Sequence, residues 1–236
     1  MELLFVHGAL VRDGAWWWGP TADLLEARTG IRSRALLLPS CGETRDDPSG
    51  GLVADAAALR AALDDTEGGA IVVGHSYGGT VLAEAGAHPA VRHLLLISSY
   101  LPDAGVSQSD IMGGEADPVQ IAATDDGLLQ LDGYDAERFG ARFLQDADSE
   151  LQRQAFERLA PQSAAAFVTP TSTAGWEGVD STYLVCTDDG STSVGLQRRH
   201  AARATRTADV PTGHHPFITR PDLVVRQLQD LVEGDR

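Results

Sequence analysis

The sequence predicts an α/β protein with a mostly parallel central sheet, helices on both faces of that sheet and an inserted helical lid. Three observations lead to this prediction. Short apolar segments without polar alternation recur along the chain, as in strands that are buried on both faces. Segments with helical periodicity separate them, which favours parallel strands joined by crossover helices. The alternation stops between residues 100 and 175, where helical patches occur without a convincing strand.

Two strand–helix pairs are expected in the first 70 residues. They are a strand at residues 3–6, a helix near 21–28, a strand at 31–38 and a helix through Leu52, Ala56, Leu59 and Leu63. The segment between the first strand and the first helix contains Gly and Trp and is expected to be a loop. Glycine supports both helix ends, since Gly30 follows the first helix and Gly68 and Gly69 follow the second.

Further strands and helices complete the pattern. The strands are expected at residues 71–73, 94–97, 182–186 and 206–210, and the helices at 80–87, at 194–204 and around Leu228 and Leu231. We expect residues 1–100 and 176–236 to form the core of the protein. Residues 101–175 are expected to form the helical lid, in which Phe139 and Phe143 have helical spacing.

Composition and charge exclude several classes of function. The 236 residues suit one sizeable domain, and the net charge is −16 without a single lysine. The absence of lysine excludes Schiff-base chemistry, a P-loop lysine and a Ser–Lys dyad. An acidic chain without basic clusters argues against binding to nucleic acid or to anionic membranes. Two cysteines are too few for a disulfide framework, and we recognise no signal peptide or membrane-spanning run, so we expect a cytoplasmic protein.

The most informative motif is Gly-X-Ser-X-Gly at residues 74–78, between an apolar strand and a helix. A serine at such a junction lies on a very tight turn, and the flanking glycines remove the clash that side chains would cause there. The hydroxyl is then exposed above the N-terminus of the helix. The motif therefore predicts Ser76 as a nucleophile.

A base and an acid follow the nucleophile in the order that this architecture uses. Asp188 and Asp189 follow the strand at 182–186, and His214 and His215 follow the last strand. Because loops at the carboxyl ends of parallel strands open on one rim of the sheet, these residues can converge on Ser76. We expect His214 to be the base, with His215 as its rival, and one of the two aspartates to orient it.

The oxyanion of an acyl-transfer reaction needs two backbone N–H groups. Tyr77 follows the nucleophile and supplies one, and Ala9, which follows His7 and Gly8 on the loop after the first strand, supplies the other. The histidines do not have the spacing of a metal motif, so we expect neither a metal nor a cofactor.

These residues make the chain resemble the α/β-hydrolase superfamily. Within it, the chain is similar to small carboxylesterases such as plant methyl-salicylate and methyl-jasmonate esterases and bacterial pyrethroid-hydrolase-like esterases, a group that also holds hydroxynitrile lyases. The segments that carry the resemblance are FVHGA at 5–9, GAWWW at 14–18, GHSYGG at 74–79, LPDAG at 101–105, VCTDD at 185–189 and GHHPF at 213–217. The resemblance implies an α/β-hydrolase fold with Asp189 as the acid and His214 as the base. Asp103 remains an alternative acid, because some members of the superfamily place the acid after the next strand, the one that follows the helix behind the nucleophile.

The chain departs from this group in two places. The loop at residues 10–13 is about two residues longer, and the lid aligns only at its ends. The hydroxynitrile lyases of the group carry threonine at the position of Gly8 and lysine at the position of His215. Glycine at the first position favours hydrolysis.

We therefore expect cofactor-free hydrolysis of an apolar carboxylic ester, with thioesters and lactones as related substrates. Leu10, Trp16, Trp18 and His215 are the expected substrate contacts, although tryptophans at the start of a helix are also typical core residues. Two alternatives remain open. One is a lyase or cyclase that uses Ser76 and His214 for proton transfer on a carbonyl substrate, and the other is a ligand-binding protein on a hydrolase scaffold. The sequence does not predict the oligomeric state.

Overall fold

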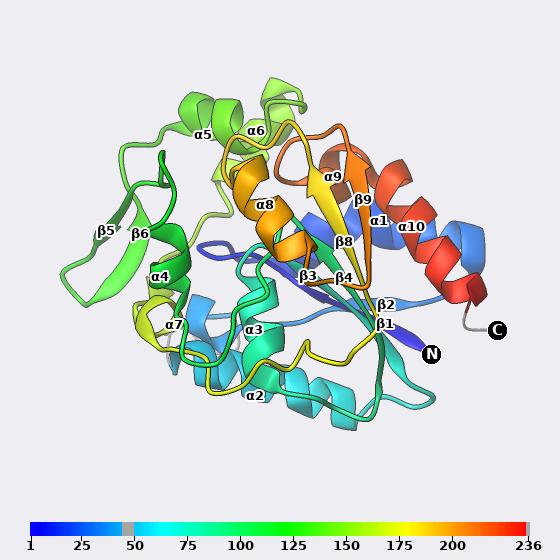
Figure 1. Cartoon of the computed structure of the whole chain (residues 1–236). Helices are drawn as coiled ribbons and strands as arrows, with labels where there is room; N and C mark the ends of the chain where they lie inside the picture. Colours follow the sequence, from blue (N-terminus) through cyan, green and yellow to red (C-terminus); the bar gives the residue numbers. More distant parts are fainter. Residues whose placement is uncertain (44–49, 235–236) are drawn as a thin grey trace.

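A six-stranded sheet forms the centre of the protein (Figure 1). The computed structural model describes residues 1–43 and 50–234. The strand order is β2-β1-β3-β4-β8-β9, and every neighbouring pair is parallel. The strands are β1 (Glu2–Val6), β2 (Ser33–Ala35), β3 (Ala70–His75), β4 (Val91–Ile97), β8 (Ser181–Cys186) and β9 (Arg206–Val210). The predicted parallel sheet is confirmed.

Helices cover both faces of this sheet, as predicted (Figure 1). On one face lie α1 (Gly14–Thr29), α9 (Pro216–Thr219) and α10 (Pro221–Gly234), and on the other lie α2 (Gly51–Asp64), α3 (Gly78–Ala85) and α8 (Val194–Ala201). Successive strand residues point to opposite faces, and here both are apolar: Leu3 packs toward α1 and α10, and Leu4 toward α2 and α3. This explains why the strands show no polar alternation.

The first helix begins earlier than the sequence predicts. Asp13 accepts a hydrogen bond from the Trp16 N–H at 3.3 Å and caps α1, so the expected Gly- and Trp-containing loop is largely helix. The helix ends at Gly30 in the left-handed region, as predicted. The second strand is also shorter than expected, because β2 lies at the edge of the sheet and pairs with β1 only over Ser33–Ala35.

The segment between β4 and β8 contains strands that the sequence did not reveal. Its helices are α4 (Gln108–Met112), α5 (Ala136–Phe143), α6 (Ser149–Phe156) and α7 (Ala165–Val168), and a short 3-10 helix, η1 (Pro39–Cys41), lies earlier in the chain. The antiparallel strands β5 (Ile121–Ala123), β6 (Leu128–Leu131) and β7 (Gln162–Ser163) form a second sheet. The helices expected in this segment are present, and the three-stranded sheet is an addition that the sequence did not predict. The division into a core and a lid at residues 101–175 stays a prediction.

None of the helices in the described part of the chain combines the length and the apolar character needed to cross a bilayer.

Candidate active site

Ser76 lies on a strained turn between β3 and α3. Its φ is 49°, in the left-handed region that residues with a side chain rarely adopt. Two hydrogen bonds keep the backbone in this conformation: the Ser76 N–H donates to the carbonyl of Ile97 at 3.3 Å, and the Ser99 hydroxyl donates to the carbonyl of Ser76 at 2.7 Å. Strain of this kind that the surroundings enforce is typical of functional sites, and here it occurs at the predicted nucleophile.

Close backbone packing requires the glycines of the turn. A Cβ at Gly78 would lie 2.5 Å from the carbonyl oxygen of Val6, and one at Gly79 would overlap the carbonyl oxygen of Tyr100. The N-terminus of α3 therefore lies against the end of β1 and against the segment that follows β4, and only glycine allows this approach.

We expect Gly79→Ala to lower the free energy of unfolding by about 3 kcal/mol, because the new methyl group forces backbone apart in a packed region. Gly19→Ala is the matched control. Gly19 also lies in a helix, but a Cβ there meets no atom within 4 Å, so alanine should stabilise by about 0.5–1 kcal/mol. Urea denaturation of both variants measures the difference, and equal effects at the two positions would contradict the packing argument.

Asp189 and His214 form a buried hydrogen-bonded pair. His214 Nδ1 lies 2.7 Å from Asp189 Oδ2, and the two side chains are 5% and 0% exposed. The other carboxylate oxygen accepts the N–H groups of Ser191 at 2.7 Å and Thr192 at 2.9 Å, and the Ser98 hydroxyl donates to Oδ2 at 2.5 Å. Burial alone would raise the pKa of Asp189, but the charge of His214 and these hydrogen bonds lower it below its ordinary value. Asp189 is therefore an anion that accepts the Nδ1 proton and leaves the Nε2 lone pair free.

The rival residues lie in different surroundings. Asp188 is exposed, and Asp103 is exposed and pairs with Arg203 on the surface. The His215 Nδ1–H donates to the carbonyl of Phe143 at 3.0 Å, and burial lowers the pKa of His215 to about 3. Of the three candidate acids, Asp189 is the one that forms a hydrogen bond with His214.

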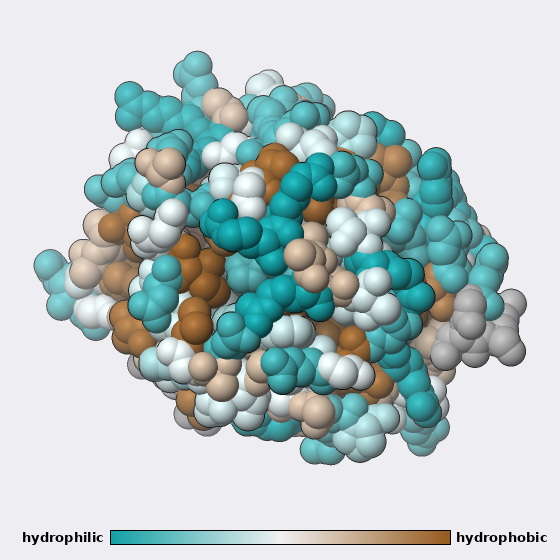
Figure 2. Space-filling model, viewed as in Figure 1, coloured by the Kyte–Doolittle hydropathy of each residue, from teal (hydrophilic) through white to brown (hydrophobic). Residues whose placement is uncertain are grey.

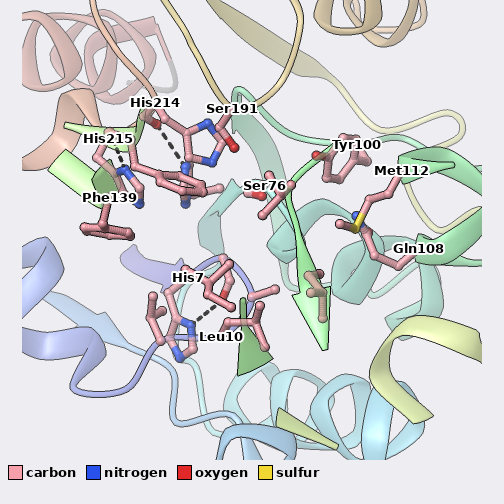
Figure 3. Close-up of a pocket in the computed structure, with 18 of the residues that line it drawn as sticks. His7, Leu10, Ser76, Tyr100, Gln108, Met112, Phe139, Ser191, His214 and His215 are labelled. Atoms are coloured by element: carbon pink, nitrogen blue, oxygen red, sulfur yellow. Dashed lines mark hydrogen bonds between the residues drawn. The ribbon is translucent and has the colours of Figure 1, made fainter. Parts of the chain in front are cut away.

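Ser76, His214 and Ala9 line the same cavity (Figure 3). The Leu10 N–H is already engaged by Gln162 Oε1 at 2.8 Å. By contrast, the N–H groups of Ala9 and Tyr77 donate to no other group in the described parts of the chain. The two predicted oxyanion donors thus remain available.

His7 and Glu43 form a second buried pair, which the sequence did not reveal. His7 Nδ1 lies 2.8 Å from the carbonyl oxygen of Gly8, and Nε2 lies 2.6 Å from Glu43 Oε2. Because both ring nitrogens face acceptors, both must carry a proton, and His7 is an imidazolium. Burial opposes that charge, but the hydrogen bond and the charge of Glu43 raise the pKa of His7 above its ordinary value. Glu43 also accepts the N–H groups of Gly14 at 3.1 Å and Leu38 at 2.9 Å.

This pair fixes the peptide unit that carries one of the two predicted oxyanion donors. The carbonyl of Gly8 and the N–H of Ala9 belong to one planar trans peptide and point in opposite directions. By donating to that carbonyl, His7 fixes the direction of the Ala9 N–H. His7 and Glu43 are positioning residues on this reading.

We expect Glu43→Gln to lower kcat between about 10- and 100-fold, less than the full loss of an oxyanion donor can cost. The charged pair is intact at neutral pH, is lost as the pH rises through the raised pKa of His7, and is also lost in acid as the pH falls through the lowered pKa of Glu43. Without the carboxylate, burial lowers the pKa of His7, so the alkaline limit of kcat should move to lower pH. Asp64→Asn, which breaks the exposed His88–Asp64 pair, is the matched control. An unchanged pH profile in Glu43→Gln would contradict the assignment.

The cavity has a volume of about 830 Å³, its open mouth included, and is mainly apolar. Its apolar lining includes Val119, Ile121, Leu131, Phe139, Phe143 and Phe167. Figure 2 shows apolar side chains gathered where the surface is hollowed beside α4. A hollow with apolar walls and few polar groups is typical of a site that binds a small molecule.

Two of the four predicted substrate contacts line this cavity. Leu10 and His215 line it, but Trp16 and Trp18 do not, and Trp17 takes their place. Trp18 stacks between Phe5 and Phe217 in the core, and Trp16 lies under the guanidinium of Arg158. Successive residues of a helix point about 100° apart, so only one of the three tryptophans faces the cavity.

One group of described residues has the composition of a metal site. One ring nitrogen from each of His75, His214 and His215 lies within 4.8 Å of the other two. The sequence did not suggest the group, because His75 is far from the other two along the chain. The three rings also pack as an aromatic group, with centroids 4.5–4.8 Å apart, and His75 Nε2 donates to the carbonyl of His214 at 3.0 Å. Packing explains the cluster without a metal.

Comparisons with known proteins agree with this arrangement. A family model described as "Alpha/beta hydrolase family" matches residues 3–227. The "Probable hydrolase R7" of Phoma sp. is 26% identical over an alignment of 207 positions that covers 82% of this chain and 83% of that relative. The "Pyrethroid hydrolase" of Sphingobium wenxiniae is 25% identical over an alignment of 251 positions that covers 99% of this chain and 88% of that relative. The crystal structure of a pyrethroid hydrolase from Sphingobium faniae superposes with a TM-score of 0.82 at 24% identity, covering 99% of this chain and 97% of that one.

Proposed function

The chain belongs to the α/β-hydrolase family, and from this premise we propose that it is a serine hydrolase that cleaves an apolar carboxylic ester through an acyl-enzyme on Ser76. The observation that carries the proposal is the Asp189–His214 hydrogen bond beside a strained Ser76 on one apolar cavity. A binding protein needs an apolar cavity but has no use for a buried carboxylate that fixes the tautomer of a histidine.

Each residue has a defined role in the proposed reaction. Ser76 Oγ attacks the ester carbonyl carbon while its proton passes to Nε2 of His214, and the N–H groups of Ala9 and Tyr77 stabilise the oxyanion. The tetrahedral intermediate collapses, the C–O bond to the alcohol breaks, and His214 returns the proton to the leaving oxygen. Water then attacks the acyl-enzyme with His214 as the base, which releases the acid and free Ser76. Asp189 stabilises the imidazolium in both steps.

The cavity supports a neutral, apolar substrate. Its walls are mainly aliphatic and aromatic, and none of the described residues that line it is an arginine. The relatives named as hydrolases, one of them as a pyrethroid hydrolase, support hydrolysis as the reaction. Thioesters and lactones react through the same acyl-enzyme and are included in the proposal.

Hydrolysis of p-nitrophenyl esters of increasing acyl length tests the activity, and a fluorophosphonate tests the nucleophile. We expect turnover with a preferred chain length, and a mass increase confined to the peptide that contains Ser76. Folded protein that hydrolyses no ester and is not labelled would overturn the proposal.

A lyase or cyclase that uses the same Ser–His pair for proton transfer is the second candidate. His215 supports this second candidate, because it lines the cavity and its ring offers a substrate another polar contact beside His214. The two mechanisms differ in the covalent intermediate. Rapid acid quenching during turnover should trap an acylated Ser76 in a hydrolase, whereas a lyase would convert its substrate without one.

A further inference from the structure

Gln108 presents an unused hydrogen-bond donor to the cavity. The residue is only 2% exposed and lines the cavity. Its Oε1 accepts the Thr80 hydroxyl at 2.6 Å, whereas its Nε2 donates to none of the described residues. That nitrogen is also absent from the polar atoms of the described chain that are sealed in the interior without a partner, which are Trp18 Nε1, Arg142 Nε and Thr212 Oγ1. The amide N–H groups therefore open onto the cavity.

Both ends of this side chain are fixed. Ser107 caps α4 directly before Gln108, with a reciprocal pair of hydrogen bonds to Asp110. At the other end, Thr80 lies in α3, four residues beyond Ser76, so the amide is tied to the helix that follows the nucleophile. Figure 3 shows Gln108 beside Met112, across the cavity from His214 and His215. The donor is preorganised relative to the proposed reaction centre.

The surroundings decide which group this donor can bind. The other polar groups on this side are already engaged: the Tyr100 hydroxyl bonds to Thr192 at 3.0 Å, and Glu115 accepts the Ser193 N–H at 2.8 Å. Among the described residues that line the cavity, Glu115 is the carboxylate and none is an arginine, and the His7 imidazolium is already paired with Glu43. A neutral acceptor oxygen matches this environment, and a carboxylate does not.

We propose that Gln108 selects esters that carry a second, neutral acceptor oxygen, such as an ether, ketone or further ester, on an otherwise apolar body. This inference rests on the proposed hydrolase function. A hydrocarbon substrate would bury the Nε2 donor unpaired, whereas an acceptor oxygen at that point would satisfy it.

Matched pairs of substrates test the proposal in wild-type protein. Each pair replaces one methylene by an ether oxygen, at successive positions along the acyl chain of p-nitrophenyl esters and along the alcohol chain of butyrate esters. The ratio of kcat/KM within a pair, corrected for the rate of hydroxide hydrolysis, reports recognition of the oxygen. We expect a preference of about tenfold for oxygen at one position, as one added hydrogen bond provides.

Three variants assign this preference to the amide. Gln108→Met removes the donor at similar length and should bring the ratio close to one. Gln108→Glu keeps an acceptor for Thr80 but replaces the donor by oxygen, so it should bring the ratio below one. Met112→Leu changes an apolar lining residue on the same helix and should leave the ratio unchanged.

The outcomes separate this inference from the proposed function. Protein that hydrolyses no ester would overturn both. Protein that hydrolyses esters with ratios within twofold of one at every position, or that keeps its preference in Gln108→Met, would overturn only the role of Gln108.

Discussion

Ser76→Ala is expected to lower kcat for the best p-nitrophenyl ester by about 10,000- to 1,000,000-fold, which is the range that loss of a serine nucleophile causes in Ser-His-Asp enzymes. The physical reason is that the alanine variant has no group to form the acyl-enzyme, and only the oxyanion donors and the apolar cavity remain. Steady-state kinetics at saturating ester measure the loss, and substrate binding should change far less because the cavity wall is otherwise intact.

Ser172→Ala is the matched control for this variant. The Ser172 hydroxyl bonds to Glu84 at 2.9 Å, and Ser172 does not line the cavity. Both variants should unfold as cooperatively as the wild type. If Ser76→Ala retained more than about a hundredth of the wild-type kcat, which far exceeds the residual catalysis expected without a nucleophile, the acyl-enzyme mechanism would be wrong.

The central sheet was predictable from the sequence because its strands are buried on both faces. An apolar run such as residues 94–97 remains recognisable without any knowledge of its neighbours. The short strands β5, β6 and β7 gave no such signal. They have three, four and two residues, are mainly half-buried, and β7 joins β6 from more than thirty positions away along the chain. Local patterns carry little information about pairing of that kind.

The predicted nucleophile and base were recognisable in the sequence for a different reason. Ser76 and His214 occur in motifs whose spacing is set by one turn each, so a single sequence reveals them. Which of the three tryptophans faces the cavity depends on where α1 begins, and the cap at Asp13 sets that start. Glu43 and Gln108 act through partners on other elements, His7 and Thr80, and a sequence alone does not show which residues meet across the fold.

Asp189→Asn is expected to lower kcat by about 10,000-fold, as the wrong histidine tautomer does in a Ser-His-Asp triad. The hydrogen bonds of the site explain why. The N–H groups of Ser191 and Thr192 donate to one carboxylate oxygen, and an asparagine that keeps both of these hydrogen bonds places its carbonyl oxygen there. Its NH₂ group then faces Nδ1 of His214, which has to accept a proton instead of donating one. The ring proton moves to Nε2, where it blocks transfer of the proton from Ser76.

The same variant gives a stability signature with a defined sign. The pKa of Asp189 is lowered in the folded protein, so its contribution to the free energy of unfolding is present above the ordinary aspartate pKa of about 3.9 and is lost as the pH falls through the lowered value. The advantage of wild type over Asp189→Asn should therefore be largest at neutral pH and shrink in acid, as urea denaturation at pH 7 and at about pH 3 would measure. Asp188 is the neighbouring residue and is exposed, so Asp188→Asn should leave kcat unchanged and should unfold with the same free energy as the wild type at both pH values. If instead Asp188→Asn abolished activity and Asp189→Asn retained it, the orienting acid would be Asp188 and the buried Asp189–His214 pair would be structural.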